Sequence, residues 1–336
     1  MRRRGVGLRG EARAPRLRVL ADGAEVPGVI SAEVSSNNHL AADRFRVRVA
    51  AVGGGLDAVD VPGLRFDVQA GLDGSWTSLV VGEADSVGLD PLRGVIDIEG
   101  RDLSALLIDT RVDETFANRT SSEIVSVLAG RHGLEVDAPS TGTMVGRYYQ
   151  SEHDQTTTGT FSKAMSEWDL LAYLAGREGV DLFMDGAMLR FVAPAGGEAV
   201  TVRPEDCISL QLEHALGMER AIEVTVRSWD QRGAQAVVQM AQGGGRGRAW
   251  KHSLVRPNLP PDEALRLAER VLADLVRHER TAFLTMPGDV GLTPRTAVSL
   301  QGTGTVWDRV YSVAEVSRQF DTRHGFTQRV CLQGVG

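Results

Sequence analysis

The sequence predicts a mostly β protein in which two β-rich domains flank a small mixed α/β domain. Residues 16–110 and 200–336 hold short alternating apolar and polar runs separated by turn residues, which is typical of a sandwich or small barrel. Residues 111–199 instead hold capped helices and a hairpin. A chain of 336 residues is long enough for two or three domains. We therefore predict a disordered arm over 1–15, β domains over 16–110 and 200–336, and an α+β domain over 111–199.

The first β domain is predicted from hairpins and alternation. Arg16–Ala21 and Glu25–Val34 are expected to form a hairpin around Asp22-Gly23, and Pro27-Gly28 marks a bulge or an edge. In Phe45–Val49 the apolar residues alternate with arginines, which indicates a half-buried strand with one charged face. Further strands are expected over 64–68, 78–85 and 94–99.

The middle domain is predicted from two helix starts. Thr120–Glu123 has the pattern of a capping box, in which the Thr and Glu side chains satisfy backbone N–H groups of the first turn. Ser166 is the expected N-cap of a second helix, and Gly179 its C-terminal stop. A hairpin over 180–192 follows, with Asp185-Gly186 as a type I′ turn.

The second β domain is predicted from seven strands and one long helix. The helix is expected over Pro261 to about Arg280, with Pro261 in its first turn and an apolar face of leucines and alanine. The run GGGRGR at Gly243–Arg248 is expected to be a flexible loop. The strands are expected over 207–212, 221–229, 234–242, 281–286, 296–300, 310–318 and 326–332.

Composition restricts the class of protein. The net charge of −7 argues against a general nucleic-acid binder, although an acidic inner surface would let DNA pass without binding. Cys207 and Cys331 are expected to be buried thiols, with a disulfide as the alternative. The arginine-rich start lacks the apolar segment of an export signal, and no run reaches membrane-spanning length. We expect a soluble protein made in the cytoplasm.

Candidate catalytic groups are few. His153-Asp154 could form a relay, but no nucleophile elbow accompanies the pair, so a solvated loop is favoured. Glu167 and Asp169 bracket Trp168 and could act as paired carboxylates, yet both fall in a first helical turn, where acids complement the helix dipole.

Cofactor and metal motifs are also missing from the sequence. The run GGGRGR lacks the GK[ST] ending of a phosphate-binding loop. The histidines form no HExxH motif and no pair at ligand spacing. We therefore predict no catalytic residue, no cofactor-binding residue and no metal ligand. The histidines occupy positions 39, 132, 153, 214, 252, 278 and 324.

The order of four segments resembles one family, the phage tail baseplate hub proteins known as the late control D family. It is also similar to the hub half of type VI secretion spike proteins. The segments are GRDLSALLIDT (Gly100–Thr110), TFANRTSSEIVSVLAGRHGL (Thr115–Leu134), SEWDLLAYLAGREGVDLFMDGAMLRF (Ser166–Phe191) and the tail Ala297–Leu332. Together they extend the resemblance over nearly the whole chain from about Arg16.

The resemblance implies two tube-like β-barrel domains per subunit and a homotrimeric ring with six such domains around a channel. Such a ring would join the sixfold tail tube to a threefold spike in the virion. The implied partners are a neighbouring hub subunit, a spike protein, the tail tube protein and other baseplate proteins, with DNA passing through unbound and no membrane contact. Two alternatives stay open, a tail-associated cell-wall hydrolase and a carbohydrate-binding β module.

Overall fold

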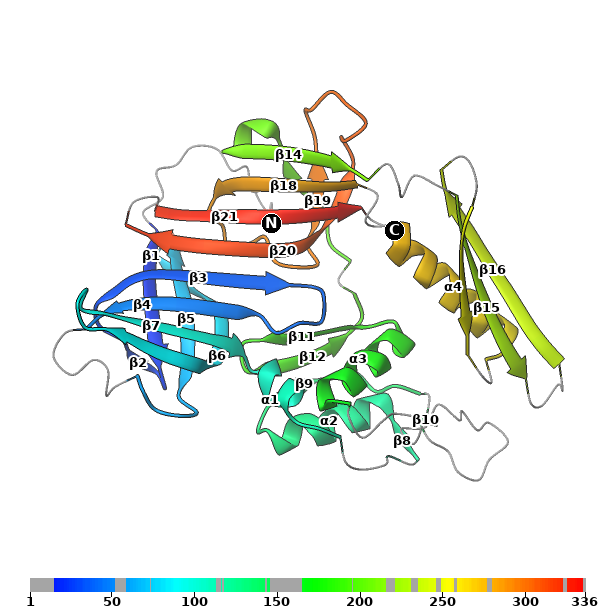
Figure 1. Cartoon of the computed structure of the whole chain (residues 1–336), viewed down its shortest axis with the longest axis horizontal. Helices are drawn as coiled ribbons and strands as arrows, with labels where there is room; N and C mark the ends of the chain where they lie inside the picture. Colours follow the sequence, from blue (N-terminus) through cyan, green and yellow to red (C-terminus); the bar gives the residue numbers. More distant parts are fainter. Residues whose placement is uncertain are drawn as a thin grey trace, which may run out of the picture.

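The structure is a computed structural model, in which most secondary structure is β (Figure 1). The residues that it describes are 15–51, 59–72, 74–112, 116, 118–142, 144–145, 165–194, 196–215, 221–230, 235–245, 249–256, 259–276, 280–322 and 325–334. Among these residues, no helix has the length and apolar character needed to cross a bilayer.

The first β unit comprises the strands that precede the first helix, and its antiparallel order is β3-β4-β7-β6-β5-β1-β2. Its core lies on the inward positions of these strands, where Val47, Phe66 and Ile98 are fully buried. The strands are β1 (Arg16–Ala21), β2 (Ala24–Glu25), β3 (Val29–Asn37), β4 (Arg44–Ala50), β5 (Arg65–Leu72), β6 (Ser75–Asp90) and β7 (Val95–Asp102).

The turn residues and the alternation of apolar and polar residues predicted the positions of most of these strands. Asp22 and Gly23 both have positive φ and join β1 to β2, as the hairpin signal predicts. Gly28 separates β2 from β3, so the predicted strand Glu25–Val34 is broken there. The outward arginines of β4 form a ladder with the acids of β7, and Arg48 donates to Asp97 at 3.0 Å.

The middle unit has its own core, built from three helices and a small sheet. Leu107 of α1, Leu128 of α2 and Leu174 of α3 are fully buried in one cluster. The strand β12 pairs antiparallel with β11 and parallel with β9. The elements are α1 (Ser104–Asp109), β8 (Arg119–Thr120), α2 (Ser121–Arg131), β9 (Glu135–Asp137), β10 (Met144–Val145), α3 (Glu167–Glu178), β11 (Asp181–Asp185) and β12 (Met188–Val192).

The hairpin turn between β11 and β12 corrects the sequence prediction. Asp185 pairs with Met188, so the two loop residues are Gly186 and Ala187 rather than Asp185 and Gly186. Only Gly186 has positive φ, whereas a type I′ turn needs positive φ at both central residues. A glycine in the first loop position is the pattern of a type II′ turn.

The second β unit joins the first one edge to edge. The antiparallel order β14-β18-β21-β20 continues through β3 into the first unit, which gives a sheet of thirteen strands with β19 and β13 at its side. We call the pairing of β20 with β3 the seam. The strands are β13 (Val200–Val202), β14 (Ser209–His214), β18 (Arg280–Pro287), β19 (Ala297–Leu300), β20 (Val310–Asp321) and β21 (Gly325–Gly334).

The seam is continuous on both faces of the sheet. Ser35 donates to Ser317 at 3.0 Å on the outer face. On the inner face, Phe320 and Phe326 stack at 3.9 Å between ring centroids and pack with Ala70 and Leu72 of β5. The described strands do not close into a barrel. The physical reason is that β20 occupies the edge of β3 that closure would need.

The segment between β14 and β18 forms a separate body, the hairpin–helix unit, at one end of the molecule (Figure 1). Its three-stranded sheet has the order β16-β15-β17, and α4 packs on one face. These strands were predicted to belong to the second β domain, yet within the described ranges they share no hydrogen-bonded edge with the large sheet. The elements are β15 (Ala221–Asp230), β16 (Gln235–Gly244), β17 (Trp250–Val255) and α4 (Pro261–Val276).

Two predicted boundaries and one predicted burial in this half of the chain were wrong. The helix that begins at Pro261 does not reach Arg280, because Arg280 is the first residue of β18. The strand expected from Cys207 begins at Ser209, because Pro204–Asp206 forms a 3₁₀ turn, η2, before it. Cys207 and Cys331 are free and half-buried rather than fully buried.

Candidate functional site at the junction of the units

The segment around α3 anchors the middle unit, as its local signals suggested. Ser166 caps the helix by accepting from the N–H of Asp169, and Asp169 accepts in return from the N–H of Ser166. Gly179 ends the helix in the left-handed conformation with φ of 70°. The indole N–H of buried Trp168 donates to the carbonyl of Leu40 at 2.6 Å, which ties α3 to the β3–β4 turn of the first β unit.

The two acids beside Trp168 have different roles, which corrects half of the sequence interpretation. Asp169 serves the helix cap and is exposed. The carboxylate of Glu167 is buried, where it accepts from Arg131 at 3.1 Å and lies 2.7 Å from Nε2 of His132. The pair therefore does not share a cleft, which a two-carboxylate hydrolase requires.

The other sequence candidates do not assemble into a site. His153 and Asp154 lie outside the described residues, as do the last three residues of GGGRGR. Within the described ranges, no group of three or more His, Cys, Asp or Glu side chains could hold a metal ion.

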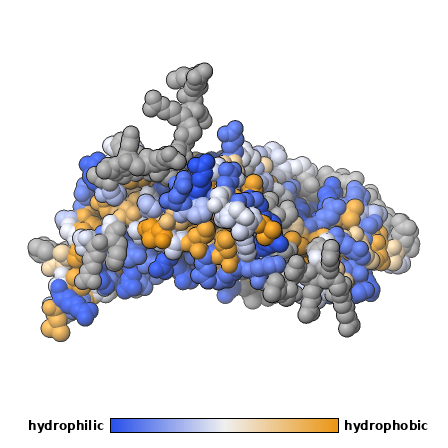
Figure 2. Space-filling model, turned by 90° about the horizontal axis from the view of Figure 1, so that it is seen from above, coloured by the Kyte–Doolittle hydropathy of each residue, from blue (hydrophilic) through white to orange (hydrophobic). Residues whose placement is uncertain are grey.

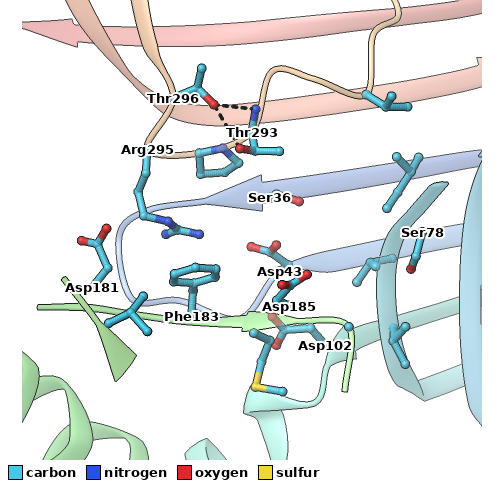
Figure 3. Close-up of a pocket in the computed structure, with 18 of the residues that line it drawn as sticks. Ser36, Asp43, Ser78, Asp102, Asp181, Phe183, Asp185, Thr293, Arg295 and Thr296 are labelled. Atoms are coloured by element: carbon cyan, nitrogen blue, oxygen red, sulfur yellow. Dashed lines mark hydrogen bonds between the residues drawn. The ribbon is translucent and has the colours of Figure 1, made fainter. Parts of the chain in front are cut away.

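A cavity of about 550 Å³ lies where the two β units meet the middle unit (Figure 3). The first β unit contributes Asp43 and Asp102, the middle unit contributes Phe183, and the second β unit contributes Arg295 and Arg318. None of these residues was predicted from the sequence to be a site residue. Charged groups of the two β units and an aromatic ring of the middle unit therefore converge in a half-enclosed space.

The surroundings of the two junction aspartates disfavour the charged form of their carboxyl groups. Asp102 is buried, and burial together with the charge of Asp43 raises its pKa to about 7. Its carboxylate accepts from the N–H of Ser104 at 3.1 Å, and the N–H of Asp102 donates to the carbonyl of Asp43. Burial also raises the pKa of Asp43, whose carboxylate accepts from the N–H of Asn37 at 2.9 Å.

The two arginines bring opposite charge from the second β unit. Burial lowers the pKa of Arg318 to about 10, and its guanidinium donates to the carbonyls of Asp289 and Leu292. Arg295 has φ of 77°, a strained value for a residue with a Cβ. Its guanidinium lies 3.9 Å from the ring centroid of Phe183. Figure 3 shows that the Arg295 side chain extends toward Phe183 and Asp43.

The junction brings a titratable carboxyl group, two arginines and an aromatic ring to one cavity. A carboxyl with a pKa near neutrality in a cavity is a feature of functional sites. Here the side chain of Ser36 hydrogen-bonds to the carboxylate of Asp43, and the arginines contact backbone carbonyls or an aromatic ring. The contact of Arg295 with Phe183 links the second β unit to the middle unit.

The comparisons with known proteins identify the fold. No family model matches the chain, and no curated protein matches its sequence. The tail protein of Neisseria meningitidis MC58 superposes with a TM-score of 0.75 at 16% identity, covering 95% of this chain and 96% of that chain. The 43 kDa tail protein of prophage MuSo2 from Shewanella oneidensis gives 0.72 at 16% identity, with the same two coverages.

A secretion protein shares the fold as well. The E. coli c3393 protein, a type VI secretion component, superposes with a TM-score of 0.57 at 10% identity, covering 95% of this chain and 77% of that chain. The chain therefore has the fold of phage tail proteins and of this secretion component. The resemblance to tail hubs drawn from the sequence is confirmed at the level of the fold.

Proposed function

We propose that this chain is a structural baseplate hub of a phage tail or a related contractile injection particle. It forms a homotrimeric ring that joins a sixfold tail tube to a threefold spike and encloses a DNA channel. The observation that carries the proposal is the fold of phage tail proteins over 95% of the chain.

The seam supports this symmetry. One chain presents two β units whose sheets are joined edge to edge by β3 and β20. Three such chains present six β units, and six is the number that a sixfold tube ring needs above the hub. The threefold arrangement of whole chains then suits a threefold spike below. The two β units thus act as the tube-like domains of the hub.

The proposed partners follow from this position. They are a neighbouring copy of the chain, the tail tube protein, a spike protein and other baseplate proteins, in a virion that assembles in the host cytoplasm. The net charge of −7 suits a channel through which DNA passes without binding, because like charges repel.

The test is reconstitution of the ring. The purified chain, alone and together with its tube and spike proteins, would be weighed in solution and viewed by negative-stain electron microscopy. The proposal expects three copies per particle and a central opening. A particle that contains one or two copies when tube and spike proteins are present would contradict it.

The two alternatives are separated by activity and by mass. A cell-wall hydrolase would degrade purified peptidoglycan, and Glu167→Gln would abolish that degradation. The burial of Glu167 between Arg131 and His132 gives no support to this role. A carbohydrate-binding β module would remain a monomer or dimer and would bind glycans.

A further inference from the structure

The large sheet has two strand edges that no other described segment pairs with. At one end, β14 (Ser209–His214) pairs only with β18. At the other end, residues 86–90 of β6 pair only with β7, because β5 reaches no farther along β6 than Glu83. Beyond these pairings, no backbone hydrogen bond to either segment occurs among the described residues. We call Ser209–His214 the β14 edge and residues 86–90 the β6 edge.

The composition of the two edges leaves them open to another strand. Unpaired N–H and C=O groups readily accept a strand, and proteins often block such an edge with lysine or proline. The sequences SLQLEH and SVGLD of the two edges contain neither residue. Apolar side chains are exposed at both, since Ile208 directly before the β14 edge is 64% exposed and Leu89 is 44% exposed. Figure 2, which is seen from the β14 end of the sheet, shows apolar atoms in a band between hydrophilic ones.

The apolar and polar sides of the two edges match. Leu210 of β14 lies opposite buried Leu284, so it is on the inner face of the sheet. Leu89 of β6 lies opposite buried Ile96, so it is on the inner face as well. A contact between the two edges therefore continues an apolar inner face and a polar outer face. The outward residues of the two edges are Ser209, Gln211, Glu213, Ser86 and Gly88.

The strand directions argue that a second copy of this chain is the partner. The sheet runs in the order β14-β18-β21-β20-β3-β4-β7-β6, and each neighbouring pair is antiparallel (Figure 1). Because the strands of this series alternate and are even in number, β14 and β6 run in opposite directions. Rotation of a second copy about an axis along the strands thus brings the two edges together in the antiparallel sense. The seam already joins two units of one chain in this way.

We infer that the β14 edge of one subunit pairs antiparallel with the β6 edge of the next copy of this chain. Because the two edges differ, the contact is head-to-tail, and such contacts form a ring when the rotation between subunits closes. Eight strands at the usual spacing span about 38 Å, so three copies give a circumference of about 115 Å and a width of about 37 Å between backbones. The inference rests on the proposed ring and names its subunit contact.

The experiment uses two variants of the full chain, studied with the tube and spike proteins present. The β14-edge variant is Ile208→Glu, and the β6-edge variant is Leu89→Glu. Each places a charge in the contact and should raise the concentration needed for assembly at least about tenfold by light scattering, with an unchanged circular dichroism spectrum. The control Val255→Glu changes an exposed residue on β17, an edge strand of the hairpin–helix unit, and should assemble as the wild type does.

Mixing the two variants tests the head-to-tail contact. The β6-edge variant keeps an intact β14 edge and the β14-edge variant keeps an intact β6 edge, so a one-to-one mixture should form a heterodimer with one intact contact. A contact of the β14 edge with itself would instead leave Leu89→Glu assembled alone and would overturn the inference.

Hydrogen exchange gives a second measurement, on the wild type. Backbone amides of the β14 edge and the β6 edge should exchange more slowly in the assembled wild type than in the two variants, because the contact pairs them. Amides of β17 should exchange at the same rate in all three proteins. Equal exchange rates at both edges in assembled and unassembled chains would also overturn the inference.

The outcomes separate this inference from the proposed function. A wild-type trimer that both variants preserve would refute the paired edges and leave the hub intact. A ring of another copy number that both variants disrupt would support the paired edges and refute the trimer. A wild type that stays monomeric with tube and spike proteins present would refute both.

Discussion

At the scale of single residues, Asp102 gives the junction a dependence on pH. Its folded pKa of about 7 exceeds the ordinary value of 3.8, so the folded state binds the proton more tightly than the unfolded state does. The contribution of this group to stability is therefore full below about pH 4 and is lost as the pH rises to about 7. Asp102→Asn removes the titration, so its stability relative to wild type should improve by about 2–4 kcal/mol across this window.

Denaturant unfolding of both proteins at several pH values measures this difference. Asp109→Asn is the control of opposite sign, because Arg101 lowers the pKa of Asp109. Asp109 thus contributes stability at neutral pH that is lost on acidification. The folded state of Asp109→Asn should therefore be less stable than that of the wild type only above about pH 4. A flat difference for Asp102→Asn would show that its carboxyl is ionised at acidic pH in the folded protein.

Gly100 is required by a close approach of two strands. A Cβ at this position would lie 2.2 Å from the carbonyl oxygen of Glu83 in β6 and 2.5 Å from the ring of Phe45. Because backbone cannot yield as a flexible side chain does, Gly100→Ala should destabilise the chain by about 1–3 kcal/mol or more. Gly130→Ala in α2 meets nothing within 4 Å and should instead stabilise it by about 0.5–1 kcal/mol. Thermal unfolding compares the two, and equal midpoints would count against the packing.

At the scale of elements, the N-cap of α3 should contribute measurably to the free energy of unfolding. Ser166→Ala leaves the N–H of Asp169 without its acceptor, which should cost about 1 kcal/mol. Ser166→Asp keeps an acceptor at the cap and should stay close to wild type. Urea unfolding followed by tryptophan fluorescence, to which Trp168 contributes together with four other tryptophans, would measure the change in stability. A loss as large in Ser166→Asp as in Ser166→Ala would point to packing rather than capping.

Elements with a strong local signal were predictable from the sequence. The capping box at Thr120, the N-cap at Ser166 and the stop at Gly179 each depend on residues close together in the sequence, and all three are confirmed. The helix α1 and the strand β17 were missed. The helix has six residues and no side-chain cap, and β17 depends on parallel pairing with β15 across a long connection.

At the scale of the whole molecule, the seam should hold the two β units as one body. Phe320 lies on the inner face of the seam and stacks on Phe326. Phe320→Ala should leave a cavity and cost about 3–5 kcal/mol. It should also speed proteolysis between the units. Phe283→Ala, which shortens a partly exposed side chain, should change stability by less than about 0.5 kcal/mol. Equal proteolysis rates in the two variants would refute a role for Phe320 in the joint.

The seam and the junction could not be predicted from the sequence. Asp43, Asp102 and Arg318 come from distant parts of the chain, and only the topology brings them together. One local signal existed, because Arg318 occupies an inward position between Val316 and Phe320 in β20. A charged residue among buried apolar positions marks a place where the core contains carbonyl acceptors.

The seam also has a consequence during synthesis of the chain. Ser35 of β3 and Ser317 of β20 are 282 residues apart, so β3 is complete long before its partner exists. At a synthesis rate of about 5–20 residues per second, the edge of β3 stays unpaired for roughly 14–56 seconds. An unpaired edge readily captures another strand. A nascent chain stalled before β20 should therefore aggregate or recruit chaperones, whereas a chain released after β21 should not.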